Sequence, residues 1–306
     1  MARGDITDIY INRPDELWIE RLGHKPERCD APGLTDTLLW RLAKQVASLT
    51  HQGISREHPL LSARLPDGSR IQIIAPPATR GPIAIAIRKH LVADLTLDDY
   101  VSQGAFARTR RGEGPSVDDE LAAFYEAEDW GAFLRRAVRQ RKTILVSGGT
   151  STGKTTFLNA LLREIPEQER LILIEDTPEI QLRHANAVGL VAIRGELGEA
   201  NVTSDDLLTA TLRMRPDRII IGELRGHEAF TFLRAANTGH PGSMSTIHAD
   251  SPEGAFEQLA MLARMGSVPA SRDEIITYAH TVVDVVVQIE HRDGKRQISQ
   301  LLWRGA

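Results

Sequence analysis

The chain of 306 residues has little of what disulfide-rich or membrane-spanning proteins contain. Cys29 is its single cysteine, which excludes an internal disulfide and a multi-cysteine metal site. The longest apolar stretch near the C-terminus, residues 282–289, is interrupted by Asp284 and is far too short to span a bilayer. The first eight residues lack the apolar core of a signal peptide. We therefore expect a soluble, cytosolic protein, which leaves docking on a membrane complex open.

The chain also lacks a large excess of either positive or negative charge. The net charge of −4 gives no broad attraction to nucleic acid or anionic lipid, although a local basic patch stays open. Hydrophobic residues make up 42% of the chain and charged residues 25%, both ordinary for a soluble globular protein. The length predicts two domains, each large enough to bury its own core.

Residues 148–155 read G-G-T-S-T-G-K-T, a complete match to the phosphate-binding loop G-x-x-x-x-G-K-[ST]. An apolar strand is expected before it at 143–147, and a helix after it at 156–163. Strand, turn and helix N-terminus together aim several backbone N–H groups at one anion, and the helix dipole adds roughly half a positive charge. In this pattern Lys154 reaches the β- and γ-phosphates and the Thr155 hydroxyl holds Mg²⁺.

The loop therefore predicts that the chain binds a nucleoside triphosphate, with ATP and Mg²⁺ as the expected cofactors. The residues expected to bind its phosphates are Gly148, Gly149, Thr150, Ser151, Thr152, Gly153, Lys154, Thr155 and Thr156.

Two apolar strands end in acidic residues. Residues 171–175 (L-I-L-I-E) lead to Glu175 and Asp176, and residues 218–222 lead to Glu223, the Walker B position. Open α/β sheets bind ligands at the carboxyl ends of their strands, so we expect both acids beside the phosphate loop. Gly222 stands where the usual Walker B Asp would be. Glu223 is therefore expected to act on Mg²⁺ through water rather than as a direct ligand.

The segment G-H-P-G-S-M-S-T-I-H, residues 239–248, holds His240 and His248. Histidines at the edge of a nucleotide site can sense or stabilise the γ-phosphate. A lone histidine, however, is more often packed or exposed than catalytic. The residues alone leave both interpretations open.

Phosphoryl transfer commonly needs a cation from outside the phosphate loop, sometimes from a neighbouring subunit. Five arginines are candidates. Arg213 and Arg215 precede the second acidic strand and Arg225 follows it, while Arg70 and Arg88 lie at strand ends of the first hundred residues.

The first hundred residues are predicted to form a small α/β domain. Helices are expected at 34–49, with Thr35 or Asp36 as cap, and at 96–103; strands are expected at 6–11, 17–20, 60–65, 70–74 and 83–87. The charged segment R-T-R-R-G-E-G-P-S-V-D-D lacks periodicity and is interpreted as a linker. The predicted division is 1–107, a linker at 108–119, and 120–306.

Beyond the linker, residues 120–140 are predicted to be helical, and strands then alternate with helices. Apolar strands between helices are typical of a P-loop α/β domain whose sheet is covered on both faces. The expected strands are 143–147, 171–175, 188–193 and 218–222, with others after Gly242.

Together the motifs closely resemble the type II/IV secretion ATPases, which carry Walker A, an Asp box, Walker B and a His box in this order. After the phosphate loop come I-E-D-T-P-E (174–179), R-P-D-R-I-I-I-G-E-L-R-G (215–226) and T-G-H-P-G-S-M-S-T-I-H-A (238–249). The first domain also resembles the traffic ATPase of type IV secretion systems, in the strand R-I-Q-I from Arg70 and the strand end I-R-K at Arg88. The resemblance spans nearly all of residues 5–290.

The resemblance implies a homohexameric ring of two-domain α/β subunits, each with a smaller N-terminal domain and a RecA-like P-loop C-terminal domain. It implies a cytoplasmic protein, peripheral at the inner membrane, whose partners are the inner-membrane components of a secretion channel. Nucleotide would lie between the two domains, and hydrolysis would drive rigid-body domain motion.

The resemblance also implies roles for individual residues. Glu175 would orient the attacking water, Glu223 would be the Walker B acid, and His248 would contact the γ-phosphate. With Lys154 these form the expected catalytic group, and Thr155 and Glu223 the expected Mg²⁺ site. Further nucleotide contacts are expected from Arg70, Arg88, Arg213 and His240.

The leading hypothesis is an ATP-hydrolysing motor for type IV secretion or conjugation. A pilus or type II secretion ATPase is the alternative; many of these carry a four-cysteine metal module, which a chain with only Cys29 cannot build, but a pilus-retraction motor stays open. A DNA-translocating ring is weakly disfavoured by the net negative charge, and no sequence-specific nucleic-acid binding is expected. A ring scaffold without hydrolysis is disfavoured by the intact Lys154, Glu175 and Glu223.

Overall fold

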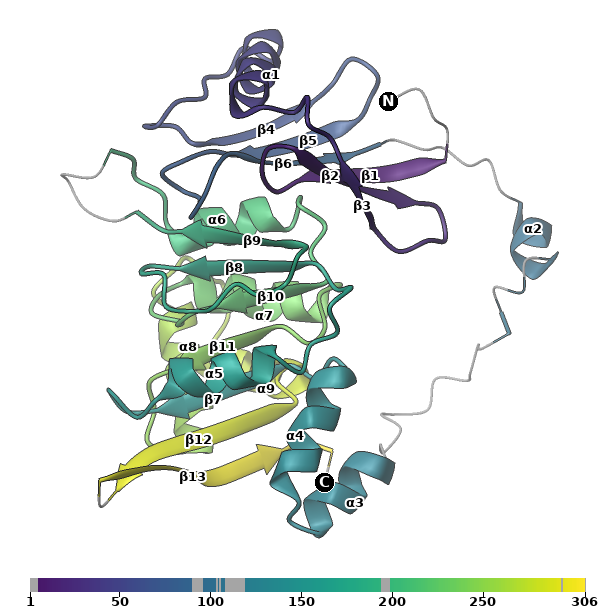
Figure 1. Ribbon diagram of the computed structural model, residues 1–306. Helices are drawn as coiled ribbons and strands as arrows, with labels where there is room; N and C mark the ends of the chain where they lie inside the picture. Colours follow the sequence, from purple (N-terminus) through teal and green to yellow (C-terminus); the bar gives the residue numbers. More distant parts are fainter. Residues whose placement is uncertain are drawn as a thin grey trace.

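The computed structural model describes residues 5–89, 96–102, 104, 106–107, 119–193, 199–292 and 294–305. Within these residues the chain builds two β-sheets, each with its own helices (Figure 1). The α/β fold with two domains is therefore confirmed. The expected linker lies outside the described residues except for Asp119, where helix α3 begins, so the predicted domain boundaries stay predictions.

The first sheet is antiparallel and, in the described part of the chain, has the strand order β3-β2-β1-β6-β5-β4. Its faces differ because alternate residues of a strand point to opposite sides. Ile71 and Ile73 share a core cluster with Leu39 of helix α1 (Asp36–Leu49), whereas Ile74 belongs to the cluster of the second domain. Its strands are β1 (Ile6–Ile11), β2 (Glu16–Arg21), β3 (Glu27–Asp30), β4 (Leu60–Arg64), β5 (Arg70–Ile74) and β6 (Ala84–Arg88).

The second sheet, as far as the structure describes it, has the order β13-β12-β7-β11-β10-β8-β9. All neighbouring strands from β12 to β9 are parallel, and β13 pairs antiparallel with β12. Its strands are β7 (Ile144–Gly148), β8 (Leu171–Glu175), β9 (Ala187–Val191), β10 (Arg218–Ile221), β11 (Met244–Ile247), β12 (Val285–Arg292) and β13 (Lys295–Trp303).

Helices cover both faces of this sheet (Figure 1). In β8, Leu171 and Leu173 pack in one core cluster with α4 and α5, while Ile172 and Ile174 pack in another with α6, α7 and α8. The continuous apolar runs of the parallel strands follow from burial on both sides. The described helices of this part are α3 (Asp119–Glu126), α4 (Trp130–Arg139), α5 (Lys154–Leu162), α6 (Ser204–Thr211), α7 (Glu228–Asn237), α8 (Pro252–Ala263) and α9 (Arg272–Val282).

Two local predictions differ from the structure. Residues 120–140 form two helices rather than one, because Glu128 takes a positive φ of 55° and Asp129 caps α4 by accepting a hydrogen bond from the amide of Ala132, 3.0 Å away. Strand β3 was not predicted, because its sequence E-R-C-D is mostly exposed and carries no apolar alternation. The predicted helix 96–103 is observed as α2 (Leu97–Ser102), and Gln103 lies outside the described residues.

The first sheet sits across the β9 edge of the second (Figure 1). The loop between β5 and β6 extends that edge. The amide of Arg80 donates to the carbonyl of Gly189 and the amide of Val191 donates to the carbonyl of Ala78, both at 2.9 Å. This short antiparallel pairing protects an edge strand that would otherwise be open.

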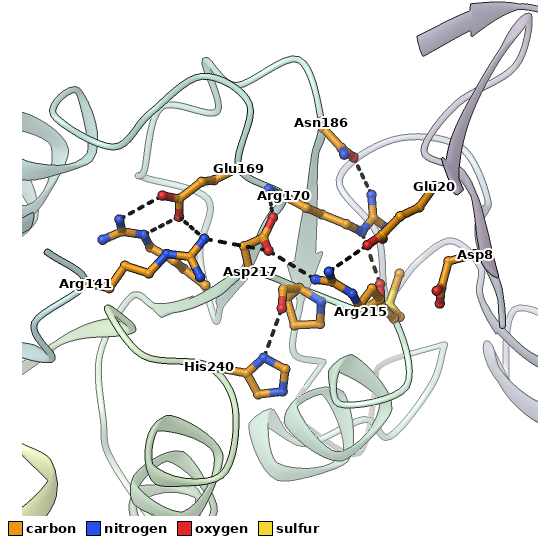
Figure 2. A network of polar contacts seen from close by, with 12 residues as sticks. Asp8, Glu20, Arg141, Glu169, Arg170, Asn186, Arg215, Asp217 and His240 are labelled. Carbon is orange, nitrogen blue, oxygen red and sulfur yellow. Dashed lines mark hydrogen bonds and ion pairs between the residues drawn. The ribbon is translucent and has the colours of Figure 1, made fainter. Parts of the chain in front are cut away.

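A buried polar network also joins the domains, at the amino ends of β8 and β10 (Figure 2). The guanidinium of Arg170 is fully buried and lies 4.2 Å from the ring centroid of Tyr10 in the first domain. It donates to Asn12 at 2.8 Å, and Arg215 pairs with Glu20 at 2.8 Å. Two arginines of the second domain thus hold the first domain at the amino ends of the strands, whereas the phosphate loop lies at their carboxyl ends.

Candidate active site

The phosphate loop joins β7 to α5 through residues in unusual conformations. Gly153 caps α5 with a φ of 97°, and Ser151 has a φ of 60°, both in the left-handed region. At Gly148 a Cβ would lie 2.5 Å from the carbonyl oxygen of Ile289, so only glycine fits. This tight turn leaves the N-terminus of α5 facing a cavity, as anion binding requires.

The cavity measures about 440 Å³ and lies at the carboxyl ends of the parallel strands. Residues 150–156 of the loop line it, whereas Gly148 and Gly149 form the strand end behind Lys154. The other lining residues come from the carboxyl ends of β8 and β11, from the segments after β8, β10 and β11, and from β13: Glu175, Asp176, Thr177, Glu179, Gly222, Glu223, Arg225, Thr246, His248 and Arg296.

Lys154 is folded back on its own loop. Its ammonium donates to the carbonyls of Gly148 and Gly149, at 3.0 and 2.9 Å, and lies 3.4 Å from Nδ1 of His248. Burial lowers the pKa of Lys154, because desolvation disfavours the charged form, and the nearby Glu223 carboxylate partly offsets this. The ammonium is held near the cavity and is only partly compensated, which suits a phosphate ligand.

Glu223 links the remaining cavity residues. Nε2 of His248 lies 2.6 Å from Oε1 of Glu223, and Nε of Arg225 contacts Oε2 of the same carboxylate. The hydrogen bond to Glu223 is the main reason that the pKa of Arg225 is raised. Another nitrogen of Arg225 lies 3.5 Å from Asp176. A chain of alternating charge therefore runs along the cavity wall.

Glu175 is 4% exposed and has both carboxylate oxygens occupied. Oε1 accepts from the amides of Glu179 and Ile180, each at 2.9 Å, and Oε2 contacts the guanidinium of Arg80 from the first domain. The side chain runs over Gly222, where a Cβ would lie 2.8 Å from Cγ of Glu175. This close approach explains why glycine occupies the usual Walker B Asp position.

A family comparison decides the identity of this site. The profile described as "Type II/IV secretion system protein" matches residues 3–289. The chain belongs to the type II/IV secretion system protein family. The predicted relation to the type IV secretion ATPases, and with it the assignment as a P-loop ATP hydrolase, is confirmed.

Individual relatives agree with the family. "Type IV secretion system protein VirB11" of Brucella suis biovar 1 (strain 1330) is 42% identical, covering 97% of this chain and 85% of its own. The protein of the same description from Bartonella quintana (strain Toulouse) is 37% identical, covering 97% and 88%. The crystal structure of the VirB11 ATPase from the Brucella suis type IV secretion system, in complex with sulphate, has a TM-score of 0.92 at 39% identity, covering 99% of this chain and 90% of that one.

The residues expected from this family's motifs are only partly brought together in one chain. Lys154, Glu175, Glu223 and His248 all line the cavity. His240 does not: its Nδ1 lies 2.9 Å from the carbonyl oxygen of Pro216, in the network of Figure 2. His240 precedes β11 and His248 follows it. His240 therefore lies at the amino ends of the parallel strands and His248 at their carboxyl ends. Two histidines in one motif therefore do not share one site.

The first-domain arginines do not reach the cavity of their own chain either. Arg88 pairs with Asp8 at 3.0 Å, and Arg70 lies directly opposite Arg88 on β5. Arg70 and Arg213 line a separate groove of about 400 Å³. The reason is geometric: the first sheet packs on the β9 edge, whereas the phosphate loop follows β7, on the other side of β11, β10 and β8. Their expected contacts with nucleotide remain proposals.

Two arginines close to the cavity or to its residues were not predicted from the sequence. Arg80 reaches Glu175 from the first domain, and Arg296 of β13 lies beside the loop, its Cδ 2.9 Å from where a Cβ of Gly153 would be. Only Arg80 left a signal in the sequence. A Cβ at Gly189 would lie 2.5 Å from Cδ of Arg80, and a glycine inside an apolar strand indicates close approach by another group.

The predicted Mg²⁺ donors fit the site. Among the described residues there is no cluster of three or more His, Cys, Asp or Glu side chains that would hold a metal by itself. A Mg²⁺ ion that arrives with a nucleotide needs only one or two protein oxygens, since phosphates and waters complete its octahedral shell. The Thr155 hydroxyl and the Glu223 carboxylate both line the cavity and supply oxygens of this kind.

Proposed function

We propose that this ATPase powers a type IV secretion machine by hydrolysing ATP in the cavity at the phosphate loop. The observation that carries the proposal is the convergence of Lys154, Glu175, Glu223 and His248 on one cavity from the ends of four parallel strands. The relatives described as type IV secretion system proteins supply the biological context. A pilus or type II motor has no comparable support.

Binding of ATP begins with an exchange of acceptors. The Lys154 ammonium leaves the neutral carbonyls of Gly148 and Gly149 for phosphate oxygens, which form stronger, charge-assisted hydrogen bonds. The amides at the start of α5 donate to the same phosphates. Thr155 directly and Glu223 through water would hold Mg²⁺, which would neutralise phosphate charge.

Hydrolysis needs a group that orients water and groups that stabilise the developing charge. Glu175 orients the attacking water and accepts its proton on a carboxylate oxygen. The Glu223 carboxylate accepts the Nε2–H of His248, which leaves Nδ1 turned toward Lys154. Lys154 and His248 are thereby held as a pair next to the γ-phosphate.

We further propose that the working form is a hexameric ring in which first-domain arginines serve a neighbouring subunit's cavity. Arg64, Arg70 and Arg88 lie opposite one another across β4, β5 and β6, and neither Arg64 nor Arg70 has an acidic partner among the described residues. Arg213 lies in the same groove as Arg70. Such concentrated positive charge fits phosphates delivered by another subunit.

Relative movement of the domains then couples hydrolysis to transport, because a nucleotide held by the second domain of one subunit and the first domain of its neighbour would draw those two domains together. The ring is placed in the cytoplasm, peripheral to the inner membrane and in contact with channel components. No helix in the described residues is both long and apolar enough to cross a bilayer.

Mixing two inactive variants tests the ring and the shared site together. Subunits with Lys154→Ala lack a working cavity, and subunits with Arg88→Ala lack the arginine. If the arginine acts across subunits, mixed hexamers contain some interfaces where both are intact, and ATP turnover returns on mixing. No return, although each variant is a hexamer by light scattering, contradicts the shared site. Turnover that requires added DNA points instead to a DNA-translocating ring.

A further inference from the structure

Arg80 is the point at which the first domain touches the proposed catalytic acid. It lies in the loop between β5 and β6, and its guanidinium contacts Oε2 of Glu175. The same guanidinium donates to the carbonyl of Ile180 at 2.7 Å. The side chains of Arg80 and Glu175 are 17% and 3% exposed, so the ion pair is largely shielded from water. Ion pairs in such surroundings are screened little by salt.

The surroundings are shaped to admit this arginine. Gly189 of β9 leaves the space through which the Arg80 side chain passes, and the Arg80 amide donates to the Gly189 carbonyl at 2.9 Å. The flanking pairing of Ala78 with Val191 fixes the backbone on the other side. The contact with Glu175 therefore depends on how the first domain is docked on β9.

This contact leaves Glu175 poorly suited to orient water. Oε1 already accepts from the amides of Glu179 and Ile180, and Oε2 faces the guanidinium. The guanidinium occupies the side of the carboxylate from which Oε2 could otherwise accept a hydrogen bond from water. A water molecule would have to compete with Arg80 for the remaining oxygen.

We propose that Arg80 is an interdomain latch that holds Glu175 inactive while the first domain is docked on β9 of the same chain. Withdrawal of the 78–80 segment removes the guanidinium and frees the carboxylate for water. The proposal rests on the role assigned above to Glu175. It adds to that role a switch that makes hydrolysis depend on domain position.

The direction of one kinetic change separates a latch from a supporting contact. In the full-length protein Arg80→Ala is expected to raise kcat at saturating ATP by about tenfold, the factor that corresponds to loss of one charge-assisted contact. KM should change little, since the arginine does not line the phosphate cavity. Arg80→Lys keeps the charge and should show a smaller increase. If Arg80 instead positions Glu175 productively, turnover falls in Arg80→Ala, and the latch is wrong.

Arg56 provides the matched control. It also spans the domains, through an ion pair with Glu199 at 2.5 Å, but it is exposed and does not contact Glu175. Arg56→Ala should leave kcat unchanged. An equal rise in Arg56→Ala and Arg80→Ala would show that general loosening of the domains is responsible and would overturn the latch. Melting curves check that each variant is folded.

Combining Arg80→Ala with Glu175→Gln separates the latch from the role of Glu175 on which it rests. In the presence of Glu175→Gln, Arg80→Ala should not change kcat, because no carboxylate remains for the latch to release. An undiminished rise in kcat contradicts the latch. If Glu175→Gln alone keeps normal turnover, the role of Glu175 fails instead. Hydrogen exchange gives a second readout: a slowly hydrolysed ATP analogue should speed exchange at the Arg80 and Val191 amides of the wild type. Unchanged exchange means that the latch does not open.

Discussion

The buried ion pair between Arg218 and Glu169 offers a stability prediction that is independent of catalysis. The Arg218 side chain is 0% exposed; it donates to Glu169 at 2.7 and 3.1 Å and to the carbonyl of Val138 at 2.7 Å. Arg218→Met removes these contacts and leaves Glu169 buried. Loss of one partner of a buried pair costs about 3–5 kcal/mol. Arg141, 3.3 Å from Glu169, remains as a second cation, so we expect a value near the lower end.

A loss of about 3 kcal/mol corresponds to a fall of roughly 6–12 °C in melting temperature for a domain of this size. Differential scanning calorimetry of the full-length protein, read at the transition of the second domain, measures it. Adding Glu169→Leu to Arg218→Met should recover most of the loss, because neither charge then remains buried.

The control is Arg272→Met, which breaks an ion pair with Glu257 that is about half exposed on both sides. Its melting temperature should stay within error, since exposed pairs contribute little. The reasoning is refuted if Arg218→Met melts like the wild type, or if the double variant melts no higher than Arg218→Met alone. Either outcome would mean that burial of the pair does not determine stability here.

Three further predictions concern the cavity and its surroundings. Lys154→Ala should abolish hydrolysis while its circular dichroism stays native, and wild-type turnover would remove the phosphate-loop assignment. Gly222→Ala should slow hydrolysis by pushing Glu175 aside, and normal turnover would show that the 2.8 Å approach is unimportant. Burial lowers the pKa of His240 in the folded protein. The contribution of this histidine to the free energy of unfolding is therefore full above about pH 6.5 and is lost as the pH falls through the folded pKa. Between about pH 7.5 and about pH 5.5 the wild type should lose more melting temperature than His240→Gln; equal losses contradict this.

Much of the cavity could be predicted because its parts are local in sequence. A phosphate loop needs only the strand before it and the helix after it. Glu175 is the last residue of β8, and Glu223 lies two residues beyond β10 in the same parallel sheet. Carboxyl ends of such strands share an edge, so sequence position alone predicts that these side chains meet. The same logic fails for His240, which precedes its strand and lies at the other edge.

Contacts between domains carry no comparable signal. Arg80 meets Glu175 only because the first sheet packs on β9, and nothing in the sequence near Arg80 states which edge it will meet. Gly189 and Gly222 are unusual because each is a glycine in or at the end of an apolar strand. The side chains that require them, however, come from elsewhere in the chain. Docking geometry, rather than local preference, determines these contacts.

The most direct test of the central claim is ATP binding and hydrolysis by Glu175→Gln. The substitution keeps the shape of the side chain and all contacts of the phosphate loop, so binding should match the wild type. Hydrolysis should fall by about a hundredfold, as expected when a group that orients and deprotonates water is lost. Glu179→Gln and Glu223→Gln serve as comparisons in the same assay. Near-normal turnover in Glu175→Gln, with either comparison variant crippled, would contradict the account.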